Sequence, residues 1–130
     1  MRIYCGIIVF VVTLPSIGGC TKAHVEPKPQ TQKVDGKVVL KDGSAFTKGG
    51  AIEFRHDEKE GVSAQGEIKA DGAFQLYTVT AQHKVIGAVE GSYTVTIIPP
   101  APDQNVQPIA IRKKYSVAPG DNQLTVVIGD

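Results

Sequence analysis

The sequence Tyr-Thr-Val-Thr-Ile at residues 93–97 alternates large apolar side chains with threonine. A second run, Leu-Thr-Val-Val-Ile at residues 124–128, has large apolar side chains at every other position. Successive side chains of a β-strand point to opposite faces of the sheet, so this alternation predicts strands with one buried and one solvated face. The two runs indicate an antiparallel sheet with its apolar face packed on a core.

The same period of two extends outward from these runs through the last hundred residues. It predicts six strands, centred near residues 37, 53, 65, 76, 95 and 126, and a seventh over Ile109–Tyr115. The segment Val79–Ile86 is predicted to be a loop or a single helical turn. Several short strands separated by turn residues predict a β-sandwich or a barrel.

Turn residues separate the predicted strands. Asp42-Gly43 and Asp71-Gly72 are typical of two-residue hairpin turns with positive φ. Asp35-Gly36 falls inside a strand pattern and predicts a β-bulge.

The chain contains no tryptophan, so aliphatic, phenylalanine and tyrosine side chains must form the core. The expected core residues are Val34, Val38, Leu40, Ile52, Phe54, Ile68, Phe74, Leu76, Tyr93, Val95, Ile97, Leu124, Val126 and Ile128.

Length and composition restrict the class of protein. The chain has 130 residues, 42% of them hydrophobic and 21% charged, as expected for one globular domain. Its formal net charge of +1 argues against an electrostatic nucleic-acid binder. Fourteen glycines and eight prolines leave little room for long helices, which excludes a coiled coil.

The N-terminus has the pattern of a secretory signal. Met1 and Arg2 precede an uncharged apolar run, Ile3–Leu14. As a helix these twelve residues would span about 18 Å, short of a hydrocarbon core of about 30 Å. A signal peptide over residues 1–19 is therefore predicted. An uncleaved N-terminal anchor is the alternative.

Residues 17–20, Ile-Gly-Gly-Cys, resemble the lipobox of bacterial lipoproteins. The resemblance implies a diacylglyceryl thioether at Cys20, cleavage after Gly19 and acylation of the new amino group. The other cysteine, Cys5, would be removed with the signal, so no disulfide or cysteine-based metal site is expected. Thr21 after the lipidated cysteine favours the outer membrane in enterobacteria-like sorting.

Residues 20–32 are expected to be the lipidated cysteine and a flexible linker. With Pro27 and Pro29 favouring polyproline II, twelve linker residues would span up to about 37 Å. Arg2 is the one charged residue within residues 1–19, so after their removal 13 basic residues remain against 13 acidic ones. No polybasic attraction to lipid is then expected, and the acyl chains would hold the membrane. Residues 33–130 are predicted to form the folded domain.

The order of motifs in this domain resembles transthyretin-like, carboxypeptidase-regulatory-like domains of planctomycete-type bacterial lipoproteins. The residues that carry the resemblance are residues 34–43, Gly50–Phe54, Ile68–Phe74, Gly91–Ile97, Lys114-Tyr115 and residues 124–126. It implies an antiparallel Greek-key β-sandwich of about seven strands, like transthyretin (prealbumin). The family's usual proline before the Lys-Tyr pair is absent from residues 109–112.

Candidate site residues are few. His56–Glu60 holds one imidazole and three carboxylates but lacks the ligand spacing of a calcium loop, so a solvated hairpin tip is expected. Asp42 and Asp71 are interpreted as turn formers. The threonines at positions 94, 96 and 125 are interpreted as outward-facing strand residues, with glycan contact as the alternative. A candidate binding surface comprises Tyr77 and the basic-aromatic cluster Arg112, Lys113, Lys114 and Tyr115. Its alternative is a basic strand edge that discourages strand addition.

These observations predict a non-catalytic, lipid-anchored cell-envelope protein whose β-sandwich serves binding, assembly or structural support. Its expected partners are the membrane, through the anchor, and an envelope protein or a glycan. No cofactor, metal or nucleic acid is expected. A carbohydrate-binding module is the alternative and would need an aromatic pair exposed on one sheet face. A hydrolase of the hydroxyisourate type is not supported, because the chain ends in Val126–Asp130 and lacks that family's C-terminal Tyr-Arg-Gly-Ser.

Overall fold

Nine strands make up the regular structure of the described chain, a computed structural model that covers residues 19, 25, 27–100 and 107–129. They are β1 (Val34–Leu40), β2 (Ala51–His56), β3 (Ser63–Glu67), β4 (Ala73–Gln75), β5 (Tyr77–Val79), β6 (Lys84–Ile86), β7 (Gly91–Ile98), β8 (Ile109–Val117) and β9 (Asn122–Ile128).

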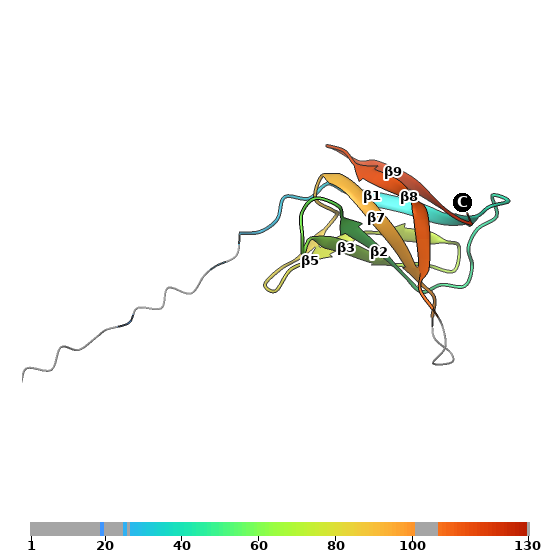
Figure 1. Ribbon diagram of the computed structural model, residues 1–130, viewed down its shortest axis with the longest axis horizontal. Helices are drawn as coiled ribbons and strands as arrows, with labels where there is room; N and C mark the ends of the chain where they lie inside the picture. The colour runs from blue at the N-terminus through green and yellow to red at the C-terminus, as the bar shows by residue number, and fades with distance from the viewer. Residues whose placement is uncertain (1–18, 20–24, 26, 101–106, 130) are drawn as a thin grey trace, which may run out of the picture.

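The strands form two sheets packed face to face (Figure 1). The small sheet has the order β4-β1-β9, and the large sheet has the order β6-β5-β3-β2-β7-β8. The buried residues of both sheets form one apolar cluster between them. The protein is therefore an all-β sandwich, as the alternation of its sequence predicted.

The predicted strand near residue 76 is in fact two strands that belong to different sheets. Leu76 lies between β4 and β5, and its amide donates to the Val34 carbonyl of the small sheet at 3.0 Å. Its carbonyl accepts from the Gly87 amide beside the large sheet at 2.8 Å. Leu76 is fully buried, so the alternation of burial continues where the chain crosses from one sheet to the other. The sequence pattern therefore does not reveal this crossing.

The segment 79–86 is not a loop over its whole length and contains no helical turn, which corrects the sequence-based expectation: only residues 80–83 form a loop, between β5 and β6. β5 and β6 form a hairpin with Tyr77 opposite Ile86 and Val79 opposite Lys84. The Thr80 amide donates to the His83 carbonyl at 2.8 Å and closes the turn. With the split at Leu76, this hairpin raises the strand number from about seven to nine.

One strand pair is parallel, which a purely antiparallel arrangement does not include. β1 and β9 run side by side in the same direction from Val34, opposite Asn122, to Leu40, opposite Ile128. The first and last strands of the body therefore close the small sheet together, with β4 antiparallel on the other side of β1.

The expected bulge at Asp35-Gly36 is absent. Both residues keep regular register with β4 and β9. Gly36 has a different role, because a Cβ there would overlap the Phe74 ring and the Leu124 carbonyl oxygen. The glycine allows the phenylalanine ring to lie against the β1 backbone.

The two Asp-Gly turns have three-residue loops rather than the expected two. In the second, the Gly72 amide donates to the Lys69 carbonyl at 2.9 Å, and the Lys69 amide donates to the Ala73 carbonyl at 2.8 Å. Gly72 has φ +83° whereas Asp71 keeps negative φ, which is the arrangement of a type I turn closed by a left-handed glycine. Asp71 Oδ1 accepts from the Ala73 amide at 3.0 Å, which confirms Asp71 as a turn former.

The core centres on Phe54. Its ring centroid lies 6.1 Å from that of Phe74, 5.9 Å from that of Tyr93 and 6.3 Å from that of Tyr115. Eleven of the expected core residues are buried, and Leu124 and Ile128 are partly buried against them. The prediction is wrong for Leu40, which is 38% exposed because it is the last residue of β1 before a turn. Buried residues that the prediction missed are Phe46, Ala64, Ala88, Ile111, Tyr115 and Val117.

The folded body begins slightly before β1. The Gln32 amide donates to the Ala88 carbonyl at 2.8 Å and the Ala88 amide donates back at 2.9 Å. Thr31 Oγ1 donates to the Ile86 carbonyl at 2.7 Å. The last two residues of the predicted linker are thus hydrogen-bonded to the large sheet, close to its β6 edge.

Candidate binding surfaces

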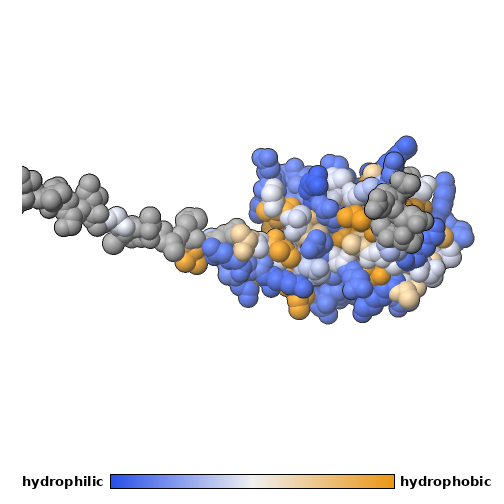
Figure 2. Space-filling model, turned by 90° about the horizontal axis from the view of Figure 1, so that it is seen from below, coloured by the Kyte–Doolittle hydropathy of each residue, from blue (hydrophilic) through white to orange (hydrophobic). Residues whose placement is uncertain are grey.

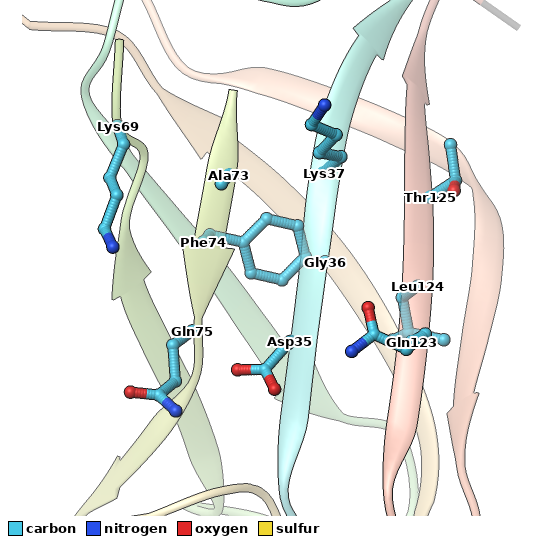
Figure 3. A pocket seen from close by; sticks show the side chains of 10 residues that line it. All are labelled: Asp35, Gly36, Lys37, Lys69, Ala73, Phe74, Gln75, Gln123, Leu124 and Thr125. Atoms are coloured by element: carbon cyan, nitrogen blue, oxygen red, sulfur yellow. The ribbon is translucent and has the colours of Figure 1, made fainter. Parts of the chain in front are cut away.

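The outer face of the small sheet carries a polar hollow of about 490 Å³ (Figure 3). Side chains and backbone from three strands, together with Lys69, line it. The lining residues are Asp35, Gly36, Lys37, Lys69, Ala73, Phe74, Gln75, Gln123, Leu124 and Thr125. We call this site the small-sheet hollow.

The register of the sheet orders the polar side chains of the small-sheet hollow into two rows. Asp35 on the central strand lies between Gln75 on β4 and Gln123 on β9. Two residues further along β1, Lys37 lies between Ala73 and Thr125. Directly paired residues lie about 5 Å apart, so each row is a cross-strand set of neighbouring side chains.

Charge in the small-sheet hollow is predominantly positive. Lys37 and Lys69 line it together with a single carboxylate, Asp35. Lys33 Nζ lies 3.3 Å from Asp35 Oδ2, and both side chains are partly exposed. The two glutamine amides add donors and acceptors beside these charges. This set can form hydrogen bonds with a polar ligand and attract an anionic group.

Tyr77, the aromatic member of the predicted surface, lies on the outer face of the large sheet. It is half-buried, and Lys84 Nζ lies 4.3 Å from its ring centroid. From β5 to β8 there are four strand-to-strand steps, or roughly 19 Å at the usual strand spacing. The structure therefore does not bring Tyr77 together with the basic cluster.

The basic cluster lies on a bulge of the edge strand β8. Tyr93 faces Tyr115 and Val95 faces Ile111, so Thr94 alone opposes Arg112, Lys113 and Lys114. All three basic side chains are exposed. A lysine-rich bulge on an edge strand disfavours pairing with another chain.

Tyr115 does not belong to this exposed cluster, which corrects the sequence-based expectation. Its side chain is 6% exposed and packs against Phe54 in the core. Its hydroxyl oxygen accepts from the Val127 amide of β9 at 3.3 Å. Tyr115 lies an even number of residues from the buried Ile111 and Val117, so it shares their inner face, and the bulge leaves this alternation unchanged.

Asp57 holds the bulge against the large sheet. Its Oδ1 accepts from Thr94 Oγ1 at 2.6 Å, and its Oδ2 accepts from Ser92 Oγ at 3.0 Å and from Lys114 Nζ at 2.9 Å. The Thr94 hydroxyl, followed by Lys114, lowers the pKa of Asp57 to about 2. Both carboxylate oxygens are thus engaged, and this role was not predicted.

His56 is the buried last residue of β2 rather than part of the solvated tip, whereas residues 57–60 are exposed as expected. Its Nδ1 accepts from the Glu58 amide at 3.1 Å and from the Lys59 amide at 3.0 Å. Nε2 then carries the proton and donates to the Glu90 carbonyl at 3.1 Å. Within residues 27–100 and 107–129, no three His, Cys, Asp or Glu side chains gather as metal ligands.

The threonines at 94, 96 and 125 do not form one ladder. Thr94 and Thr96 lie on β7 of the large sheet, whereas Thr125 lies on β9 of the small sheet. Thr94 is committed to Asp57, and Thr125 lines the small-sheet hollow.

The predicted lipidation residue, Cys20, lies outside the described residues, as does most of the predicted signal peptide. In the part of the chain that the structure does describe, no helix is long and apolar enough to cross a membrane.

Sequence reasoning missed the small-sheet hollow, although one signal for it is visible in retrospect. Asp35 and Lys37 alternate with glycine and valine on one strand, and Gln123 and Thr125 alternate with apolar residues on another. The alternation indicates polar outer faces. It does not indicate that strands some ninety residues apart in the sequence are neighbours.

Comparison with known proteins gives one structural likeness. No family model and no curated protein sequence matches the chain. A DUF3823 family protein from Parabacteroides merdae, solved by crystallography, aligns with a TM-score of 0.47 and 12% sequence identity. The alignment covers 78% of this chain and 47% of that protein, so the chain spans less than half of its length.

Proposed function

We propose that this chain is a lipid-anchored protein of the bacterial cell envelope whose β-sandwich binds a polar partner without catalysing a reaction. Cys20 within Ile-Gly-Gly-Cys would carry the acyl anchor, residues 21–30 would serve as the linker, and the outer membrane would be the site of anchoring. The partner would be an envelope protein or a glycan.

The small-sheet hollow is the single observation that carries the binding role. Except for Lys69, its polar side chains project from three paired strands, so their spacing is fixed by the sheet rather than by a loop. A site on paired strands holds its hydrogen-bonding groups in place before the ligand arrives, which reduces the entropy lost on binding.

The non-catalytic part of the proposal is supported by the partners of two neighbouring titratable groups, His56 and Asp57. His56 uses both ring nitrogens in hydrogen bonds to backbone groups. Asp57 uses both carboxylate oxygens to hold β7 and β8. Each group stabilises the fold and has no ring nitrogen or carboxylate oxygen without a protein partner.

Mass spectrometry of the protein purified from its own cells tests the anchoring. We expect an N-terminus at Cys20 that carries acyl mass, and loss of that mass in a Cys20→Ser variant. An intact Met1 or an unmodified thiol would refute the anchored placement.

Site-specific photo-crosslinking tests the binding role. A photoreactive residue at Gln123, within the small-sheet hollow, is compared with one at Gln65, which is exposed on the outer face of the large sheet. We expect the same protein or glycan adduct repeatedly from Gln123 in native envelopes and no protein or glycan adduct from Gln65. Equal or absent adducts at both positions would refute the hollow as the binding surface.

The polar lining also favours a glycan as the second candidate ligand, because amides and carboxylates bind sugar hydroxyls. The aromatic pair expected of a carbohydrate-binding module is not present on a sheet face within the described residues, where Tyr77 is the one aromatic residue that is not buried. Calorimetric titration with cell-wall polysaccharides separates the two candidates, since a protein partner predicts no heat with any glycan.

A further inference from the structure

The β5–β6 hairpin presents two exposed large apolar residues, Val79 and Ile86, on the outer face of the large sheet, where Ile98 at the end of β7 is another. Tyr77 and Ile86 are paired and share this face with the neighbouring pair Val79 and Lys84, while Thr78 and Val85 point inward. Ile86 is 64% exposed and Val79 is 46% exposed. We call Tyr77, Val79, Lys84 and Ile86 the hairpin patch.

The linker reaches the folded body beside the hairpin patch. Pro27 and Pro29 line a hollow of about 500 Å³ together with Val79 and other residues of β3, β5 and the turns. Thr31 then donates to the carbonyl of Ile86 itself. Apolar residues appear on the surface at the end of the body that the linker joins (Figure 2).

The proposed linker leaves little chain between the anchor and these contacts. Six residues lie between Cys20 and Pro27, so seven Cα-to-Cα steps of at most about 3.5 Å each span roughly 25 Å. Pro27, which lines the same hollow as Val79 of the hairpin patch, is therefore held within roughly that distance of the lipid headgroups in the anchored protein. At the same rise, the twelve residues of the whole predicted linker would span roughly 42 Å.

The chemistry of the hairpin patch suits a lipid surface. Between Gly72 and Val89 the sequence contains no aspartate or glutamate, and it carries Lys84 and His83. Exposed aliphatic side chains beside a tyrosine and a lysine match the headgroup region, where rings and long basic side chains place their polar ends in water. The acidic residue that lines the hollow beside Val79 is Glu60, which lies in the β2–β3 turn next to Lys59.

The geometry points to the β5–β6 hairpin as a second membrane contact, with Ile86 and Val79 resting in the headgroup layer of the bilayer that holds the anchor. This inference rests on the proposed lipid anchor. It assigns an orientation, because the small-sheet hollow lies on the opposite sheet of the sandwich and would face away from the lipid (Figure 1). The ligand surface would then be open to the envelope space.

Fluorescence quenching of the mature, lipidated chain in vesicles of phosphatidylethanolamine and phosphatidylglycerol tests this contact. One fluorophore is attached at Ile86→Cys and, in a matched variant, at Leu40→Cys. Leu40 is a 38% exposed leucine at the end of β1, on the small sheet that would face away from the lipid. A nitroxide lipid should quench the label at position 86 several-fold more than the label at position 40, because only the label at position 86 would reach the headgroup layer. Iodide dissolved in the water should quench the label at position 40 more strongly than the label at position 86.

Equal quenching at the two positions by both agents would overturn the hairpin contact while leaving the anchor intact. The wild-type chain distinguishes failure of the anchor itself. A thioether at Cys20 takes up no label, whereas a labelled wild-type chain would refute lipidation, and with it the proposed placement.

Discussion

Gly36 shows how a single missing side chain fixes the packing of the small sheet. The Phe74 ring occupies the space where a Cβ would lie, and the Leu124 carbonyl oxygen borders it. Gly36→Ala should lower the free energy of unfolding by about 1–3 kcal/mol, because the ring or β9 must move. Urea denaturation measures the change. Lys37→Ala, at the exposed next position, should change it by less than about 0.5 kcal/mol, and an equal loss in both variants would contradict this account.

Asp57 makes the stability of the fold depend on pH in the acidic range. Its pKa is about 2 in the folded protein against an ordinary 3.8, so the folded state favours the ionised form. The stabilisation is present above about pH 4 and is lost as the pH falls from there toward 2. Acid titrations followed by circular dichroism should show a shallower decline for Asp57→Asn than for the wild type. Asp42, whose pKa the Ser44 hydroxyl and amide lower, leaves a residual slope in both.

At the scale of the elements, Asn122 joins the β8–β9 connection to the start of the body. Its Oδ1 accepts from the Ala118 amide at 2.9 Å, and its Nδ2 donates to the Ala118 carbonyl at 2.9 Å and to the Gly120 carbonyl at 3.1 Å. Asn122→Ala should cost about 1–3 kcal/mol, because it leaves backbone groups without partners. Thermal unfolding measures the loss. Gln123→Ala, at the exposed neighbouring position, should unfold like the wild type.

The strands were predictable where alternation coincides with one buried face, as at Tyr93–Ile97. The crossing at Leu76 was not, because a residue buried between two layers fits the same alternation as a continuous strand. The bulge of β8 was also hidden, since three consecutive basic residues carry no alternation. The inward orientation of Tyr115 was predictable, because it alternates in phase with Ile111 and Val117; the three basic residues before it led to its assignment to the exposed surface.

The whole molecule depends on β9, because the strand pairs with β1 along its entire length and adds Val126 to the core. Deleting residues 122–130 should leave the chain without a stable sandwich, seen as loss of dispersed amide signals in NMR spectra. Deleting Gly129 and Asp130 alone should preserve them. A folded 1–121 chain would show that the small sheet does not need its parallel strand.

The small-sheet hollow shows the limit of prediction at this scale. Each of its strands was predictable as amphipathic, yet the site exists because β4, β1 and β9 lie side by side. Strand order arises from the way the whole chain closes, which short-range patterns do not encode. The family resemblance likewise implied a sandwich and did not indicate this hollow.

The parallel alignment of β1 with β9 would have a mechanical consequence if the proposed anchor holds the protein by its N-terminus. Tension entering through residue 32 acts along the axis of β1, whose seven residues pair with seven on β9. A load in that direction is shared by all the rungs of the ladder at once, so the pair must slide rather than peel apart. The body should therefore resist unfolding under a force applied through the linker far better than under the same force applied at a hairpin such as β5–β6.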